Sequence, residues 1–285
     1  MGIGAQSPLW RRCLLRLFGS TYVRRKGRFG NEAFEAYVSP GSSLRVLAPR
    51  GIPVDPVHER FIREWVRPDS VVWDIGTNLG LFAFPAAIQA SRGRVIGFEP
   101  DIEIVAQLTR GINLRANAGR PFVVLPIAVS DADEIAKYQV SRYSRAMSKL
   151  EAVGRWHQAQ VDAKEVRHVV TMRIDALAGF LPPPTAIKID VEGAEAKVLQ
   201  GGEATIARFR PAILIEGPKE LADEIGAFFR RNGYVMFDGA SADRVALAQP
   251  VWDTIAVPAE SLERAGKPAF ASHVPSRGPD ARPGS

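Results

Sequence analysis

The segment 70–80 constrains the fold of this chain more than any other stretch. It opens on an apolar run, Val71 to Trp73, of the kind that forms a buried strand of a parallel sheet. Asp74 follows, then a loop with glycines at positions 76 and 80, then an apolar helical pattern. A strand, a glycine loop and a helix in this order bring backbone N–H groups and a helix N-terminus against a ligand. The segment therefore predicts a ligand-binding unit of an α/β fold.

The loop differs from the usual dinucleotide signature. Its pattern, Asp74-x-Gly76-x-Asn78-x-Gly80, spaces the glycines more widely than G-x-G-x-x-G, in which a pyrophosphate touches the backbone. A carboxylate ahead of the turn suits a cation, such as the ammonium group of an amino-acid moiety, better than a pyrophosphate. For this loop alone, an ordinary glycine turn between a strand and a helix is the alternative.

Strand and helix patterns alternate along the chain. Strands are expected at 71–73, 94–98, 122–129, 186–190 and 212–216, followed by an antiparallel pair at 234–237 and 254–257. Helices are expected at 57–66, 81–90, 101–117, 191–209 and 222–231. This alternation predicts a doubly wound α/β fold, with a mostly parallel seven-stranded sheet between two helical layers.

Several candidate site residues follow the predicted strands directly: Asp74, Glu99, Ala128, Asp190 and Glu216. Ligands of such sheets bind beyond the carboxyl ends of the strands, at the switch in strand order. Four carboxylates gathered on one edge repel each other unless a cationic ligand, a lysine or a metal compensates their charge. We therefore expect a charged site along this edge.

Glu99 lies 19 residues after Gly80, at the end of the next predicted strand. At this distance a βαβ unit places an acid under a ribose, where it accepts two hydroxyl hydrogen bonds. A helix N-cap is the alternative role, although Asp101 suits that position. NAD would fit Glu99 equally well, but the G-x-G-x-x-G pattern is missing.

Lys188 lies in an otherwise apolar strand and shares a side of it with Asp190. A lysine buried there must pair with an acid or lose its charge, and Asp190 and Glu216 are the expected partners. A structural ion pair without chemistry is one alternative, and a divalent ion shared by the two acids is another. We favour a site without a metal.

Five motifs in this order resemble the FkbM family of class I S-adenosylmethionine (SAM)-dependent methyltransferases. They are Asp74-x-Gly76-x-Asn78-x-Gly80, Glu99-Pro100, Ala128-Val129-Ser130, Arg173-Ile174-Asp175-x-Leu177 and Lys188-Ile189-Asp190-Val191-Glu192-Gly193-Ala194-Glu195. The last motif is the most specific, whereas the first marks only the superfamily. Thr77 replaces a common alanine. The resemblance covers 70–216, with 252–257 as the last strand.

The resemblance implies a role for each matching residue. The SAM loop would consist of Asp74, Gly76, Asn78 and Gly80. Glu99 would hold the ribose hydroxyls, and Ala128 and Val129 would line the adenine. Asp190 and Glu192 would face the transferred methyl group and the acceptor. The implied activity is O-methylation of hydroxyl groups on sugars or secondary metabolites.

A sugar hydroxyl is a very weak acid, so a positioned base assists its methylation. Asp190 is the first candidate for this base and Glu192 the second, with Lys188 tuning the acid or orienting the acceptor oxygen. His157 and His168 are further candidates. Methylation of a nucleobase amino group is disfavoured, because the Asn/Asp-Pro-Pro-aromatic motif of such enzymes does not follow the strand at 186–190.

The net charge of +6 is unevenly distributed. Residues 1–31 contain seven Lys and Arg and no acid, which leaves 30 basic against 31 acidic residues elsewhere. The basic character thus belongs to an N-terminal arm and gives no strong signal for nucleic-acid binding by the domain. Weak docking of 9–28 on an anionic membrane surface or a partner is an alternative to a solvated arm.

We divide the chain into a basic arm (1–30), an N-terminal cap (31–68), the methyltransferase domain (69–257) and a disordered tail (258–285). Within the domain, the polar segment 131–172 is expected to be an insertion that gates the site and binds the small-molecule or carbohydrate acceptor. One cysteine, Cys13, excludes an internal disulfide and suits a cytoplasmic protein.

Three other functions remain open at this point. The first is a nicotinamide-dependent oxidoreductase on a related sheet. The second is a SAM-binding protein without catalysis. The third is an enzyme that modifies RNA with the help of the basic arm.

Overall fold

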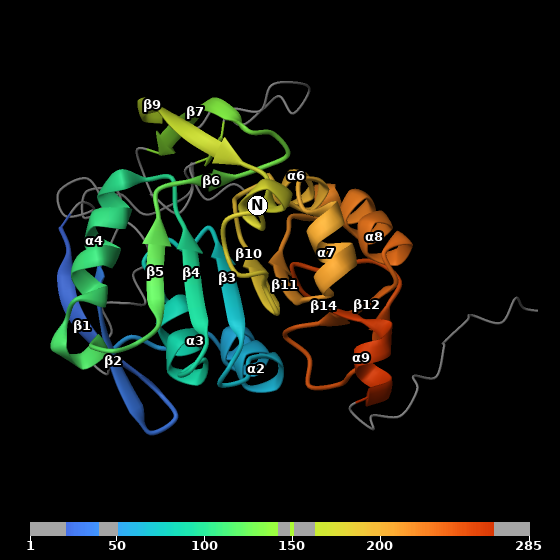
Figure 1. Cartoon of the computed structure of the whole chain (residues 1–285), viewed down its shortest axis with the longest axis horizontal. Helices are drawn as coiled ribbons and strands as arrows, with labels where there is room; N and C mark the ends of the chain where they lie inside the picture. Colours follow the sequence, from blue (N-terminus) through green and yellow to red (C-terminus); the bar gives the residue numbers. More distant parts are fainter. Residues whose placement is uncertain (1–20, 40–50, 142–148, 151–162, 265–285) are drawn as a thin grey trace, which may run out of the picture.

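The computed structural model describes residues 21–39, 51–141, 149–150 and 163–264 of the chain. Figure 1 shows a central sheet with helices on both faces and a smaller sheet above one end of it. Across the central sheet the strands are β13 (Ala246–Leu247), β12 (Tyr234–Asp238), β14 (Asp253–Pro258), β11 (Ala212–Glu216), β10 (Ala186–Ile189), β3 (Val71–Ile75), β4 (Arg94–Phe98) and β5 (Phe122–Leu125).

The topology of the central sheet confirms the doubly wound α/β class. The five strands from β11 to β5 are parallel, and β14 is antiparallel to both β11 and β12. The two-residue β13 joins the seven expected strands as an eighth, at the edge next to β12. The chain runs outward from β3 to β5 and then returns to the other side of β3 as β10. The switch in strand order therefore lies between β3 and β10, where such folds bind ligands.

Helices cover both faces of the sheet because its strands are apolar on both sides. The described helices of four or more residues are α2 (Pro56–Trp65), α3 (Ala83–Gln89), α4 (Ile102–Ile112), α5 (Ile174–Leu177), α6 (Glu195–Gln200), α7 (Glu203–Phe209), α8 (Ala222–Arg231) and α9 (Ala259–Arg264). Helices α2 to α4 contribute to one apolar core, and α5 to α8 contribute to the other. Within the described ranges, none of these helices combines the length and apolarity needed to span a bilayer.

Several predicted helix starts are confirmed by their capping contacts. Asp55 caps α2, its Oδ1 accepting from the Val57 N–H at 2.8 Å, with a proline at the first helical position. Asp101 caps α4 in the same way, accepting from the Glu103 N–H at 2.9 Å. Helix α3 begins after Phe82, so Pro85 lies in its first turn, where a missing N–H costs nothing.

Three elements differ from their predicted extents. The helix expected at 101–117 ends at Ile112, and Arg115–Asn117 form a separate short 3₁₀ helix. The strand expected at 122–129 ends at Leu125, because Pro126 has no N–H to continue the ladder. The helix expected to reach Phe209 is divided into α6 and α7 at Gly201 and Gly202. A Cβ on Gly201 would lie 2.1 Å from the main-chain oxygen of Ser130, so the chain approaches too closely for any larger residue.

The described part of the 131–172 insertion forms the smaller sheet. Its strands β9 (Ala163–Met172), β7 (Glu134–Ser141) and β8 (Lys149–Leu150) lie side by side in this order, and β6 (Ala128–Val129), which precedes the insertion, pairs with β9 at the edge. Arg167 of β9 reaches the start of α4, donating to Asp101 Oδ1 at 2.9 Å and to Glu103 Oε1 at 2.8 Å. The insertion is thereby attached beside the carboxyl ends of the central strands (Figure 1).

The N-terminal region differs from the expected arm. Residues 23–29 form β1 (Val23–Phe29), which pairs with β2 (Glu32–Val38) in a hairpin. Phe34 of this hairpin is buried and stacks on Phe84 of α3 at a centroid distance of 5.8 Å. The basic residues at 24–28 thus belong to a strand. At the other end, α9 occupies the start of the expected tail, and the segments 1–20 and 265–285 lie outside the described residues.

We expect Gly76→Ala to lower the free energy of unfolding by about 3 kcal/mol. Gly76 has a φ of 79°, and a Cβ there would lie 1.8 Å from the main-chain oxygen of Asp190. Gly119 is the matched control, since its φ is 78° but its Cβ would meet no atom within 4 Å. Gly119→Ala should therefore lower the free energy of unfolding by only about 1 kcal/mol, because backbone strain is its only cost. If urea denaturation gave the same loss of unfolding free energy for both variants, this would contradict the close approach of Gly76 to the main chain of Asp190.

Candidate active site

Lys188 lies at the centre of the carboxyl edge of the sheet. Its Nζ is 3.0 Å from Asp190 Oδ2 and 3.8 Å from Asp74 Oδ1, and it donates to the main-chain oxygen of Gly76 at 3.3 Å. Lys188 is almost fully buried. Burial alone would lower its pKa, but the carboxylates of Asp190 and Asp74 raise it instead, so the ammonium group is charged. The structure thus brings together three of the predicted site residues around one cation.

Asp74 is fully buried at the end of β3, opposite Lys188 in the β3–β10 register. Neither carboxylate oxygen has a hydrogen-bond partner among the described residues. Burial raises the pKa of Asp74 to about 6, against the opposing charge of Lys188. A buried carboxylate that makes no hydrogen bond to a described residue fits a ligand that supplies N–H or O–H donors, such as the ammonium group of SAM.

The loop after Asp74 is held against β4 by its backbone. The N–H groups of Gly76 and Thr77 both donate to the Phe98 carbonyl, at 3.0 and 3.1 Å. Asn78 has a φ of 47°, and its buried Oδ1 lacks a hydrogen-bond partner among the described residues. Gly80, with a φ of 77°, leaves no room for a side chain because Leu108 and Phe84 lie against it. The loop therefore presents a second polar atom without a partner.

Glu99 follows β4 and is almost fully buried. Its two carboxylate oxygens accept from the N–H groups of Asn78 and Asp101, each at 2.9 Å. Burial outweighs these two hydrogen bonds and raises the pKa of Glu99 to about 7. Since a carboxylate has about four acceptor positions, two remain for further donors such as ribose hydroxyls. The loop after Asp74 and the carboxylate of Glu99 together thus fit a nucleoside that carries an amino-acid group.

Ala128 and Val129 are buried in β6 rather than in the central sheet. They pair with Thr171 and Met172 of β9, so the insertion and the end of β5 meet at this point. Their contact with the adenine remains a prediction. Of the insertion's two histidines, His168 is exposed on β9, and His157 lies outside the described residues.

Glu192 lies in the turn between β10 and α6, where its φ is 54°. Glu195 is fully buried and holds this turn, its Oε1 accepting from the N–H groups of Gly193 at 3.0 Å and Val191 at 3.3 Å. Glu192 is exposed as a whole residue. Its pKa is nevertheless raised to about 7, mainly because its carboxyl group is desolvated and further because Asp190 and Glu195 carry like charge. Glu192 therefore adds a second acid beside Asp190.

The sequence analysis missed two members of this edge, His58 and Asp253. His58 of α2 lies 2.9 Å from Glu216, between its Nε2 and the carboxylate Oε1. Asp253 begins β14 and is paired with Glu216 in the β11–β14 register. The helical spacing that puts Phe61 and Ile62 on the buried face of α2 also puts His58 there, and this signal was available.

The two acids proposed as shared metal ligands have other partners. Asp190 pairs with Lys188, and Glu216 pairs with His58. Within the described ranges, no three His, Cys, Asp or Glu side chains are placed to hold a metal ion.

Comparison with known proteins gives a family for this chain. A family model described as the methyltransferase FkbM domain matches residues 74–236. The AMB antimetabolite synthetase AmbE of Pseudomonas aeruginosa is 29% identical over 208 residues, which are 59% of this chain and 10% of that protein. The hexuronic acid methyltransferase AglP of Haloferax volcanii is 29% identical over 146 residues, which are 50% of this chain and 54% of that protein.

The chain thus spans about a tenth and about half of the lengths of these two curated relatives. Among solved structures, methyltransferase FkbM of Methylobacillus flagellatus is similar at a TM-score of 0.45 and 17% identity, over 67% of this chain and 43% of that one. The matched region contains every motif residue described above from Asp74 to Glu192. Residues 74–236 form a SAM-dependent methyltransferase domain, and the chain belongs to the FkbM methyltransferase family.

Proposed function

We propose that this protein transfers the methyl group of SAM to a hydroxyl group of a sugar, a glycan or a secondary metabolite. The observation that carries the proposal is the arrangement around Lys188. Its ammonium group joins Asp74, a buried carboxylate that makes no hydrogen bond to a described residue, to the partly exposed carboxylate of Asp190. The first suits the cofactor and the second suits an acceptor. The family supports methyl transfer, and the name of AglP supports a sugar-derived acceptor.

The cofactor side of the proposal uses the residues of the first two strand ends. Bound SAM supplies an electrophilic methyl group on a sulfonium centre. Asp74, Asn78 and Glu99 would hold its polar groups, because each has acceptor capacity that no described residue uses. Gly76 and Gly80 shape the loop, and Ala128 and Val129 would line the adenine. The site then orients the cofactor relative to the acceptor, which is the main requirement of an in-line displacement.

On the acceptor side, Asp190 is the proposed base. A third of its side chain is exposed, while its Oδ2 is held at 3.0 Å by Lys188. The carboxylate would accept the hydroxyl proton as the acceptor oxygen bonds to the methyl carbon, while the bond from that carbon to the sulfonium sulfur breaks and S-adenosylhomocysteine leaves. Lys188 would orient the Asp190 carboxylate. Glu192 is the alternative base, and its pKa of about 7 suits proton transfer near neutral pH. We also propose a cytoplasmic location, because a chain with one cysteine forms no internal disulfide and suits a reducing compartment.

Incubation of a cell extract with the protein and methyl-labelled SAM tests the proposal. We expect label on a sugar, a glycan or another hydroxyl-bearing metabolite, detected by mass spectrometry. Label on RNA would favour a nucleic-acid acceptor. SAM binding without any transfer of label would favour a protein that binds the cofactor without catalysis.

We expect Asp190→Asn to lower kcat by about 10²–10⁴-fold, because the proton acceptor is lost. The Kd for SAM should stay within about threefold, since Asp74, Asn78 and Glu99 are unchanged. Asp243→Asn, in an exposed loop, is the control and should keep full activity. Steady-state kinetics with the acceptor found above, together with calorimetric SAM binding, make this measurement. Unchanged kcat in Asp190→Asn would transfer the role of base to Glu192.

We expect SAM affinity to rise about tenfold from pH 6 to pH 8. The pKa of Glu99 is about 7 without cofactor, so its carboxyl group is mostly protonated at pH 6 and mostly ionised at pH 8. The ionised form accepts hydroxyl hydrogen bonds better, so binding strengthens as the pH rises. Glu99→Gln should bind SAM more weakly and lose most of this slope in calorimetry. If the SAM affinity of Glu99→Gln changed with pH as much as that of the parent protein, Glu99 would be ruled out as the source of the pH dependence.

A further inference from the structure

Arg167 of β9 joins the insertion to the start of α4. Its Nη1 donates to Asp101 Oδ1 at 2.9 Å, and its Nη2 donates to Glu103 Oε1 at 2.8 Å. Glu165, two residues earlier on the same face of β9, accepts from the Arg167 Nε at 2.7 Å. The side chain of Arg167 is 13% exposed, and that of Asp101 is fully buried. The guanidinium group is thus held in one orientation by three carboxylates.

Asp101 links Arg167 to Glu99, the residue proposed to hold the ribose hydroxyls. The N–H of Asp101 donates to Glu99 Oε1 at 2.9 Å, while the carboxylate of Asp101 accepts from Arg167. The other carboxylate oxygen of Glu99 accepts from the Asn78 N–H of the SAM loop, also at 2.9 Å. A continuous chain of hydrogen bonds therefore runs from β9 through Asp101 and Glu99 to the SAM loop.

The charge of Arg167 acts on the same place. Burial is the main cause of the raised pKa of Glu99, and the negative charge of Asp101 adds to it. The guanidinium group of Arg167, 2.9 Å from Asp101 Oδ1, offsets part of that charge. Loss of Arg167 would remove a favourable interaction from a fully buried carboxylate. We expect Asp101 to turn toward water in response, which would displace the N–H that holds Glu99.

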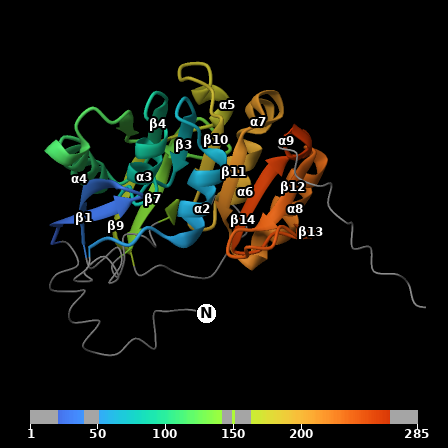
Figure 2. The same cartoon turned by 90° about the horizontal axis from the view of Figure 1, so that it is seen from below.

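The opposite end of α4 is attached independently of Arg167. Asn117, in the short helix after α4, donates through its Nδ2 to the carbonyl groups of Gly111 and Glu35, at 2.7 and 2.6 Å. Glu35 belongs to β2, and Figure 2 shows the β1–β2 hairpin beside α4. Loss of Arg167 should therefore displace the residues at 99–101 without unfolding α4.

We propose that Arg167 is a positioning residue for the cofactor, which sets the Glu99 carboxylate for the ribose hydroxyls by holding Asp101. The inference rests on the SAM site of the proposed function and does not depend on the identity of the acceptor. It gives the insertion a role in cofactor binding, in addition to the acceptor binding expected from its sequence. In this role Arg167 touches neither the cofactor nor the reacting atoms, because Asp101 lies between it and Glu99.

Two ligands separate an effect on the ribose from a general loss of binding. One is S-adenosylhomocysteine, and the other is its 2′,3′-dideoxy analogue, which lacks both hydroxyl donors. We expect Arg167→Met to raise the Kd of the full chain for S-adenosylhomocysteine about tenfold in calorimetry, because the contact of Glu99 with the hydroxyl groups weakens. The Kd for the dideoxy analogue should change by less than about twofold. Equal rises for the two ligands would overturn the proposal.

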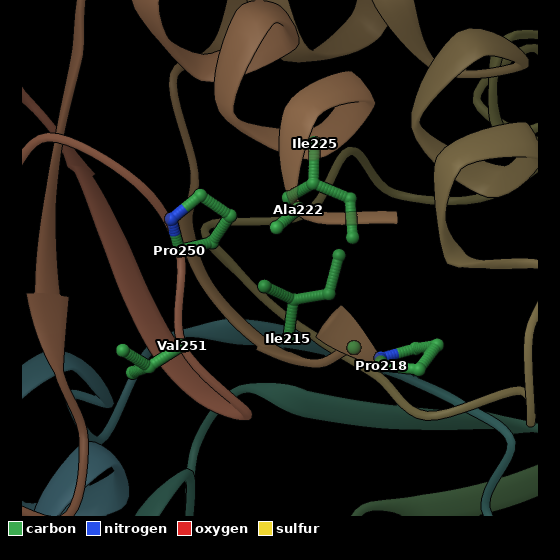
Figure 3. Close-up of a pocket in the computed structure, with 7 residues that line it drawn as sticks. Ile215, Pro218, Ala222, Ile225, Pro250 and Val251 are labelled. Carbon is green, nitrogen blue, oxygen red and sulfur yellow. The ribbon is translucent and has the colours of Figure 1, made fainter. Parts of the chain in front are cut away.

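Ile225→Val is the control for lost stability. Ile225 is buried in α8 and lies over Ile215 in the hollow shown in Figure 3, which Pro218 and Pro250 also line. Removal of one methylene group there destabilises the fold without touching α4. The Kd of this variant for each ligand should stay within about twofold of the parent value, with thermal unfolding recorded for both variants. A matching rise in Ile225→Val would mean that the effect of Arg167→Met is a loss of fold.

Glu103→Ala and Arg167→Lys test the route through Asp101. Glu103→Ala removes one partner of Arg167 but keeps the contact with Asp101, so the Kd for S-adenosylhomocysteine should rise less than about threefold. Arg167→Lys keeps the charge but loses the planar fork of donors, so its Kd should lie between those of the parent and of Arg167→Met. If Glu103→Ala weakened binding as much as Arg167→Met, the attachment of the insertion as such would be the cause, and the assignment to Asp101 would be wrong.

Glu99→Gln separates this inference from the cofactor assignment on which it rests. The double variant with Arg167→Met should bind S-adenosylhomocysteine no more weakly than Glu99→Gln alone, because Arg167 acts through Glu99. Additive losses would overturn the proposal and leave Glu99 as the ribose ligand. If Glu99→Gln alone weakened the binding of both ligands equally, the assignment of Glu99 to the ribose would fail instead. Transfer of label to an acceptor is measured separately and tests the proposed methyl transfer.

Discussion

The buried ammonium group of Lys188 is the interaction on which the rest of the site depends. An unpaired charge in the middle of an apolar sheet would cost several kcal/mol, so the fold must bring carboxylates to it. The parallel register of β3 and β10 supplies Asp74 from the neighbouring strand, and the residue after β10 supplies Asp190. The hydrogen bond from Lys188 to the Gly76 carbonyl also joins the SAM loop to β10. One cation thereby fixes the proposed cofactor side and the proposed acceptor side relative to each other.

This arrangement explains why the site lies where the strand order switches. On one side of β3 the chain continues through β4, whose end carries Glu99 against the SAM loop. On the other side β10, β11 and β14 end in Asp190, Glu216 and Asp253. The residues proposed to hold the cofactor and those proposed to face the acceptor therefore occupy opposite halves of the same edge. The insertion is attached near the cofactor half, through Arg167 and Asp101.

Local patterns were sufficient for most elements of the domain. Apolar runs predicted the long strands of the central sheet, and the position of Pro85 predicted where α3 begins. Predictions of element ends were less accurate where the cause lay outside the segment. The division between α6 and α7 falls at Gly201 and Gly202, a pair that disfavours a helix interior. The close approach of Gly201 to Ser130, by contrast, is visible only in the fold. The strand β1, at 23–29, was missed because its basic exposed positions resemble a solvated arm, while the burial of the hairpin depends on packing against α3.

The candidate site, like the fold, could be predicted from the sequence only in part. The α/β class, the strand-end positions of Asp74 and Glu99, and the need of Lys188 for acidic partners follow from residue type and spacing, because each depends on neighbours along one strand and its turn. The roles expected of Ala128, Val129 and Glu192 came from the family resemblance. The pairing of His58 with Glu216, 158 residues apart, and the placement of Asp253 beside them depend on how α2 and β14 pack against β11. Such contacts between distant segments arise from the burial of shared apolar surface. They leave no local pattern, so they became visible only in the folded chain.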